Sequence, residues 1–154
     1  MKKPMTPKKF LNALGQIELQ KVGFVEISSK FHLESIKDGE ITVDSKSDVE
    51  IQVDEKSNSL AAFDNYHFQG LVKSTVLFEI TLRLLAVFET KVKPDKEFLR
   101  LFEHNTLKVI TYPYVRQEVQ NLTSKMGLSP LILPMWRVPA KADKEYLKPS
   151  SNGH

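Results

Sequence analysis

A long alternation of side chains between Val76 and Glu89 constrains the fold more than any other feature of the sequence. Its even-numbered positions are all apolar: Val76, Phe78, Ile80, Leu82, Leu84, Ala86 and Phe88. A period of two residues predicts a β-strand that packs one face against a core. Since most strands are only about 5–6 residues long, this one indicates a large, strongly twisted sheet.

Three weaker alternations precede this strand. The first runs from residue 22 to 34, and its predicted core face is Val25, Ile27, Phe31 and Leu33. The second is more polar, with a brief piece near Ile41 and a longer one over residues 49–54, so we expect it at a sheet edge. The third is an extended run over residues 60–73.

Helical patterns lie on both sides of the strands. Residues 8–20 fit a short helix, and Pro94 opens a second one. We expect residues 106–111 to be extended or irregular, and Pro113 to begin the longest helix, which Gly127 ends. The apolar stripe of this helix is Val115, Val119, Leu122 and Met126, and a proline-punctuated apolar segment, 128–134, follows. Strands followed by helices predict an α+β domain with an antiparallel sheet and helices packed on one face.

Length and composition set the class of protein. A chain of 154 residues suits one domain, and 41% hydrophobic with 27% charged residues is typical of a globular one. The absence of cysteine excludes disulfides, zinc–thiolate sites and a cysteine nucleophile. Residues 1–9 lack the apolar stretch of a signal peptide, so we expect a cytoplasmic protein. We divide the chain into an N-terminal extension (1–20), one domain (21–138) and a polar flexible tail (139–154).

The net charge of +3 comes from dispersed lysines with a small cluster near each end. The clustered lysines are Lys2, Lys3, Lys8, Lys9, Lys141, Lys144 and Lys148. We interpret them as solvated surface charge, with a nucleic-acid footprint as the alternative.

No catalytic or metal-binding pattern stands out. The four histidines, His32, His67, His104 and His154, lack the spacing of metal ligands. Glu79 and Glu89 share a strand face, but at ~3.3 Å per residue they lie too far apart to act as an acid/base pair. We therefore predict neither an enzyme nor a cofactor. Apolar residues outside the predicted core faces instead indicate an oligomer interface or a binding groove, and they include Phe24, Phe63, Leu77, Leu85, Val87, Met135 and Trp136.

Two adjoining segments resemble the SecB family of chaperones. They read Tyr112-Pro-Tyr-Val-Arg-Gln-Glu-Val-Gln-Asn-Leu-Thr123 and Met126-Gly-Leu-Ser-Pro-Leu-Ile-Leu-Pro134. The family's signature is an aromatic-Pro-aromatic helix start with an Arg and a Glu in its first turns, followed by a Pro-Leu-x-Leu segment and a further proline. The resemblance extends loosely over residues 18 to 138.

The resemblance implies a four-stranded antiparallel sheet with helices on one side, assembled as a dimer of dimers. Family members hold unfolded polypeptides in hydrophobic grooves without ATP, in protein export with SecA as partner or as guardians of an antitoxin. Carried over to this chain, the client groove would be formed by Phe63, Tyr66, Leu131, Leu133 and Trp136. The oligomer interface would be formed by Val115, Val119, Leu122 and Met126.

Two features differ from the export-serving members of the family. This chain is basic rather than acidic, and residues 141–148 stand where those members carry a further helix. The sequence therefore predicts an ATP-independent holding chaperone, with export and antitoxin protection both open. The alternative from another class is a small basic regulatory or nucleic-acid-binding domain. A third is an enzyme with a ligand in the same apolar cavity.

Overall fold

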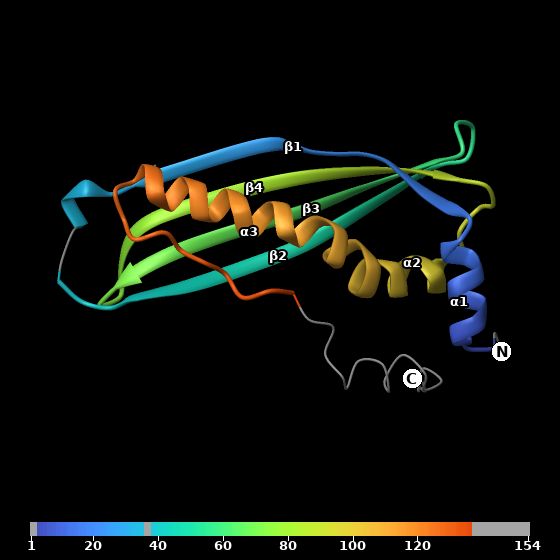
Figure 1. The fold of residues 1–154 in the computed structure, drawn as a ribbon, viewed down its shortest axis with the longest axis horizontal. Helices are drawn as coiled ribbons and strands as arrows, with labels where there is room; N and C mark the ends of the chain where they lie inside the picture. The colour runs from blue at the N-terminus through green and yellow to red at the C-terminus, as the bar shows by residue number, and fades with distance from the viewer. Residues whose placement is uncertain (1–2, 36–37, 137–154) are drawn as a thin grey trace, which may run out of the picture.

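The computed structural model describes residues 3–35 and 38–136. Its elements in chain order are α1 (Pro7–Leu14), β1 (Ile17–Phe31), the 3₁₀ turn η1 (Leu33–Ser35), β2 (Ile41–Asp54), β3 (Ser59–Val72), β4 (Thr75–Thr90), α2 (Lys96–Phe102), the π-helical turn η2 (Glu103–Leu107) and α3 (Lys108–Lys125). Figure 1 shows an elongated sheet with α3 lying along one of its faces.

The sheet is four-stranded and antiparallel, in the order β1-β4-β3-β2, so β1 and β2 are its two edges. The predicted α+β class and the four-stranded antiparallel sheet with helices on one face are confirmed. The β3–β4 hairpin turns at Lys73 and Ser74, which both adopt positive φ. Two successive residues with positive φ are the turn geometry that matches the twist of a tight hairpin.

Strand β2 is continuous, although the sequence predicted two separate pieces. It pairs with β3 in one unbroken register from Ile41 opposite Val72 to Asp54 opposite Ser59. The residues between the predicted pieces, 44–48, are all polar and carry no apolar alternation. They are extended because β3 offers a continuous ladder of hydrogen-bonding groups, which is a tertiary effect.

The predicted core face of β1 is wrong in the first half of the strand, up to Val25. The register with β4 shifts between Phe24 and Glu26, which leaves Val25 as an extra, bulged residue that is 52% exposed. Before the bulge, Phe24 lies on the helix-facing side and packs at the core; after it, Ile27 and Phe31 lie on that side, opposite Leu82 and Phe78. Leu33 lies beyond the strand, exposed in η1. One inserted residue reverses the alternation, so a single period of two cannot describe the whole strand.

Helix α1 ends earlier than the sequence predicted, at Leu14 rather than residue 20. Thr6 caps its start by accepting a hydrogen bond from the Lys9 amide, and Gly15 follows its end. Residues 17–20 belong to β1. The division of the chain at residue 20 stays a prediction, and the whole predicted tail, 139–154, lies outside the described residues.

Helices α2 and α3 form one helical segment from Lys96 to Lys125, joined by η2. Residues 106–111 are therefore helical, and Pro113 lies inside α3 instead of beginning it. Proline removes one backbone hydrogen bond and normally disfavours this position. Burial compensates for that cost, since Leu107 and Thr111 on either side of the first turn are fully covered by the sheet.

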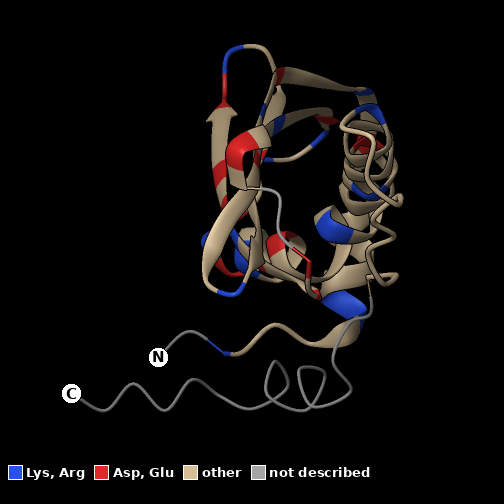
Figure 2. Ribbon diagram, turned by 90° about the vertical axis from the view of Figure 1, so that its left-hand side faces the viewer, with Lys and Arg blue, Asp and Glu red and all other residues tan. Residues whose placement is uncertain are grey.

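The core lies between the sheet and the helical segment, in two groups of side chains. Under α3 are Tyr66, Phe68, Val72, Leu77, Phe78, Ile80, Leu82, Val115, Val119, Leu122 and Leu133. Toward α1 and α2 are Leu60, Ala62, Ala86, Phe88, Phe98, Phe102 and Leu107, with Phe10, Leu14 and Ile17 packed on them. Figure 2 shows the sheet and the helical segment as two separate layers. Within the described part of the chain, helices cover one face of the sheet and no helix covers the other.

Candidate functional site

An aromatic-lined groove lies on the helix-covered side of the sheet, beside the edge strand β2. It has a volume of about 380 Å³. Its lining comes from β2 (Val43, Ser45, Ser47), β3 (Tyr66, Phe68), α3 (Tyr112) and the segment after α3 (Leu131, Ile132, Leu133, Pro134, Trp136). None of these residues is charged, so the groove is suited to apolar groups with a few polar contacts.

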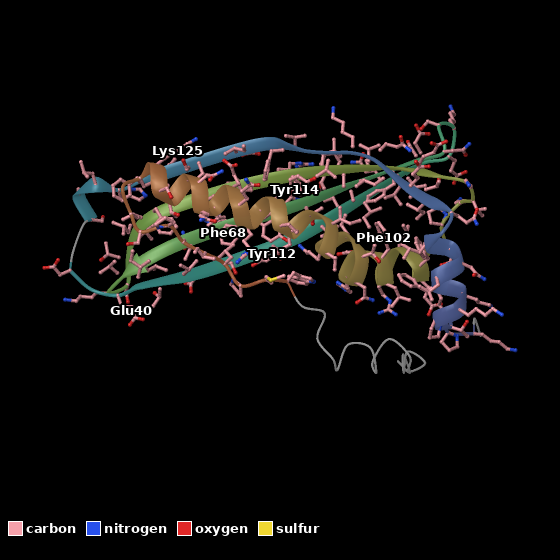
Figure 3. The ribbon with its side chains drawn as sticks, in the orientation of Figure 1. Glu40, Phe68, Phe102, Tyr112, Tyr114 and Lys125 are labelled. Carbon is pink, nitrogen blue, oxygen red and sulfur yellow. The ribbon has the colours of Figure 1, made fainter. Side chains whose placement is uncertain are left out.

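Four aromatic side chains form the wall of the groove. The rings of Tyr66 and Phe68 are stacked with their centroids 5.7 Å apart. Tyr112 lies 6.3 Å from Tyr66 and 5.5 Å from Trp136, tilted against both. Figure 3 shows Phe68 and Tyr112 together near the middle of α3. Contiguous aromatic surface of this kind binds apolar side chains with little demand on their identity.

Two hydrogen bonds fix the segment that closes the groove. The Arg116 side chain donates from Nε to the Leu133 carbonyl, at 2.6 Å. The Thr123 hydroxyl accepts from the Leu131 amide, at 2.9 Å, and donates to the Val119 carbonyl. Because both anchors come from α3, the helix positions the segment as well as the aromatic wall. Figure 1 shows this segment running back along α3 and across the sheet toward β2.

A buried polar network lies directly behind the aromatic wall. Asp64 is fully buried, and Lys108 donates from Nζ to its carboxylate and, at 2.9 Å, to the Tyr66 hydroxyl. The Tyr66 hydroxyl donates to Asp64 at 3.0 Å, and the Thr111 hydroxyl lies 2.6 Å from the same carboxylate oxygen. Buried charges are tolerated when they are paired and hydrogen-bonded in this way. Burial and the Asp64 charge both raise the pKa of Tyr66 well above its usual value.

The ammonium of Lys108 also connects this network to the groove. It lies 4.3 Å from the Tyr66 ring centroid and 5.9 Å from that of Trp136. Cations are attracted to the faces of aromatic rings within about 6 Å. The network therefore orients two of the groove's aromatic residues and links α3 to β3.

Four of the five predicted groove residues lie together, and one does not. Tyr66, Leu131, Leu133 and Trp136 all line the groove. Phe63 is separated from them, because it is opposite Leu85 and Glu50 in the sheet and faces the open side. There the Arg83 guanidinium lies 4.3 Å from its ring centroid.

The predicted oligomer interface is mostly core. Val115 and Val119 are fully buried and Leu122 is 8% exposed, all packed on the chain's own sheet. Met126 is partly buried against the same core. The narrow apolar stripe of α3 thus serves the fold of the single chain, since an amphipathic helix buries its apolar face against the nearest sheet. The residues of α3 that remain exposed include Val109, Gln117 and Asn121.

Sequence reasoning missed several residues of the groove. The spacing of two residues places Phe68 on the same strand face as Tyr66, but Phe68 was not among the predicted groove residues. Tyr112 stands beside Pro113, where we expected a helix start rather than a groove wall. The sequence carries no signal for Ser45 and Ser47, which line the groove only because β2 pairs with the aromatic part of β3.

A smaller apolar pocket of about 330 Å³ lies at the end of the sheet near Gly127. It is lined by Phe31, Leu33, Gly39, Ile41, Val72, Leu77, Met126, Gly127 and Leu128. Across residues 3–35 and 38–136, no cluster of histidine and acidic side chains could hold a metal ion. In the same part of the chain, no helix has the length and apolarity needed to cross a membrane.

Comparison with known proteins places this architecture among solved structures. The SecB-like chaperone of Mycobacterium tuberculosis, in complex with a ChAD peptide from the HigA1 antitoxin, superposes with a TM-score of 0.73. The match covers 82% of this chain and 95% of that chain, at 17% sequence identity. The chain has the SecB-like fold.

Two other comparisons found no match. No protein-family model matches the chain, and no curated protein matches it. A protein of unknown function from Streptococcus agalactiae superposes with a TM-score of only 0.42 at 10% identity, covering 77% of this chain and 97% of that chain. The SecB-like fold is thus retained with little of the sequence in common.

Proposed function

We propose that this protein is a holding chaperone that binds unfolded polypeptide segments in the groove beside β2, without ATP. The observation that carries the proposal is the uncharged, aromatic-lined groove of Tyr66, Phe68, Tyr112 and Trp136 on a SecB-like fold. Unfolded chains expose apolar side chains in extended segments. An open aromatic groove can bind such segments with little sequence preference.

The proposed activity is binding rather than catalysis. None of the groove's lining residues is acidic, basic or histidine, so the groove has no general acid or base of those types. Among the clients that the sequence predicted, we favour an antitoxin. The support is the M. tuberculosis SecB-like chaperone, which was solved with an antitoxin peptide. Protein export with SecA is the second client route, and a cytoplasmic location goes with either.

We further propose that the chain assembles as a dimer of dimers, as the sequence resemblance predicted. The exposed residues of α3, including Val109, Gln117 and Asn121, carry few charges and suit contact with another copy. Light scattering coupled to size-exclusion chromatography measures the assembly. A mass of four chains is expected, and a mass of one chain at micromolar concentration would contradict the proposal.

Tyr112 and Tyr114 offer a matched pair of variants for testing the groove. Both are on α3, two residues apart, but Tyr112 lines the groove whereas Tyr114 is 46% exposed and does not. Figure 3 labels both residues. Tyr112→Ala removes a ring that contacts both Tyr66 and Trp136, and Tyr114→Ala removes an aromatic ring of equal size from elsewhere on the same helix.

The assay is the aggregation of reduced insulin, followed by light scattering without ATP. The wild-type protein and Tyr114→Ala should suppress aggregation at a few-fold molar excess, and Tyr112→Ala should lose most of this effect. Both variants are first checked for an unchanged mass and thermal midpoint. The proposal fails if the wild type does not suppress aggregation, or if the two variants lose the same amount of suppression.

A further inference from the structure

The outer edge of β2 presents unpaired backbone groups to solvent. Among the described residues, β2 pairs with β3 on one side and with no strand on the other. The alternation of an antiparallel ladder shows which residues these groups belong to. The Thr90 amide donates to the Asn58 carbonyl at 2.8 Å, in line with the register of β3 and β4. Even-numbered residues of β3 therefore bond to β4, and odd-numbered ones bond to β2.

The same alternation continues across to β2. Odd-numbered residues of β3 are opposite even-numbered residues of β2, as in Asn65 opposite Asp48. The odd-numbered residues of β2 thus direct their amides and carbonyls away from the sheet: Ile41, Val43, Ser45, Ser47, Val49, Ile51 and Val53. Three of them, Val43, Ser45 and Ser47, also line the groove with their side chains. Backbone and side-chain binding capacity therefore coincide in the same residues.

Two serines make room on this face of the sheet. Ser45 is opposite Phe68 and Ser47 is opposite Tyr66. On the same face of β2, Val43 precedes the two serines and Val49 follows them. Because a serine side chain is small, the two serines leave free space above β2, next to the large rings of β3. The overlying segment that carries Leu131 to Trp136 closes the space from the helix side.

We infer that a client segment binds as an extra antiparallel strand on the β2 edge, with two large apolar side chains, two residues apart, above Ser45 and Ser47. The inference rests on the proposed function and states how the groove recognises its client. Side chains on one face of a strand are about 6.6–6.8 Å apart in both the client and β2, so they remain in step. Backbone hydrogen bonds provide sequence-independent affinity, and the two serine positions select bulky residues.

The smaller apolar pocket extends the same binding surface. It includes Ile41, which is the next outward-directed residue beyond Val43 on β2. A client strand long enough to pass Ser47, Ser45 and Val43 would place a further apolar side chain there. The preferred client is therefore an extended segment in which apolar residues alternate with other residues, in the pattern of a half-buried strand.

The test uses a fluorescein-labelled peptide in which serine alternates with phenylalanine and leucine, with arginine at each end. Two modified versions carry backbone N-methyl groups, one on three apolar residues and one on three serines. In an antiparallel addition, the residues that face the groove are also those that bond to β2. N-methylation of the apolar residues should weaken binding by about tenfold or more, and N-methylation of the serines should change it little. Fluorescence anisotropy with the wild-type protein measures the three affinities.

Variants of the serines test the second part of the inference. Ser45→Leu and Ser47→Leu fill the space and should weaken binding of the unmodified peptide, while Ser45→Ala should not. Both serines are exposed, so the thermal midpoint is expected to remain unchanged. Equal weakening by the two N-methylated sets, or unchanged binding to Ser45→Leu, would overturn the strand-addition inference alone. Peptide binding that is insensitive to Tyr112→Ala would instead count against the proposed groove.

Discussion

Replacement of Lys108 by methionine is expected to destabilise the protein severely, because it leaves the Asp64 carboxylate buried without its counter-charge. Methionine has a similar length and no charge, so it removes the ion pair while largely filling the same space. Asp64 has no exposed surface, and Lys108 is only 6% exposed. The remaining partners of the carboxylate are the hydroxyls of Tyr66 and Thr111.

The expected magnitude follows from the burial of both partners. Removal of one partner from a buried ion pair costs about 3–5 kcal/mol, because the remaining charge is not compensated. Domains of this size are stable by roughly 5–15 kcal/mol in total. For a chain of about 150 residues, each kcal/mol shifts the thermal midpoint by roughly 2–4 °C, so a fall of about 6–20 °C is expected. Lys108→Met would then be one of the most damaging single changes in the fold.

The double variant Lys108→Met with Asp64→Leu separates the buried charge from the loss of packing. It removes both charges and leaves Tyr66 without an acceptor, a cost of about 1–3 kcal/mol. Thr111 retains the Leu107 carbonyl as acceptor, at 2.9 Å. Urea unfolding at fixed protein concentration should thus find the double variant more stable than Lys108→Met alone. The reasoning is refuted if Lys108→Met costs less than about 1 kcal/mol, or if the two substitutions are additive.

Three further outcomes are expected. Gly70→Ala should cost about 1–3 kcal/mol of unfolding free energy, since its Cβ would lie 2.1 Å from the Phe78 ring; Phe78→Leu should reduce that cost in a double-mutant cycle. The fold raises the pKa of Tyr66, so the neutral phenol stabilises the folded state fully below pH ~10, and this stabilisation is lost as the pH rises above that value. Absorbance at 295 nm should show one of the four tyrosines ionising only on unfolding. Hydrogen bonds from His32, then Gln69, lower the pKa of Glu79, so this carboxylate stabilises the fold above pH ~4.5 and loses that effect in acid. The difference in thermal midpoint between Glu79→Gln and wild type should be largest at pH 7 and should shrink as the pH falls below ~4.5.

The sequence predicted the central strands well because their period is regular. In β3 and β4, nearly every second residue is buried, in step with the alternation of apolar residues. Both strands are covered by helices on one face and bordered by strands on both sides, so local pattern and tertiary environment agree. The edge strands were predicted less well. Val25 is exposed at a bulge, and residues 44–48 have no apolar pattern although they are extended.

The structure brings some of the predicted site residues into one groove and places others elsewhere. Leu131, Leu133 and Trp136 follow one another closely in a proline-punctuated segment, and they lie in one groove. Phe63 is three residues from Tyr66 in the same strand, so the period of two places the two side chains on opposite faces, and the assignment of both to one groove conflicted with that period. The stripe of Val115 and Val119 was assigned to a partner, but the chain's own sheet covers it.

The sequence by itself determined the alternating strands, the amphipathic helix and the apolar segment that follows it, because these depend on neighbours within a few residues. Only the tertiary structure decided which surfaces meet. Asp64 and Lys108 are 44 residues apart, and no local pattern marks them as a buried pair. The serines of β2 acquire a role because the register with β3 places them opposite Phe68 and Tyr66. Periodicity fixes which face of a strand a residue occupies, whereas packing between distant segments fixes what that face contacts.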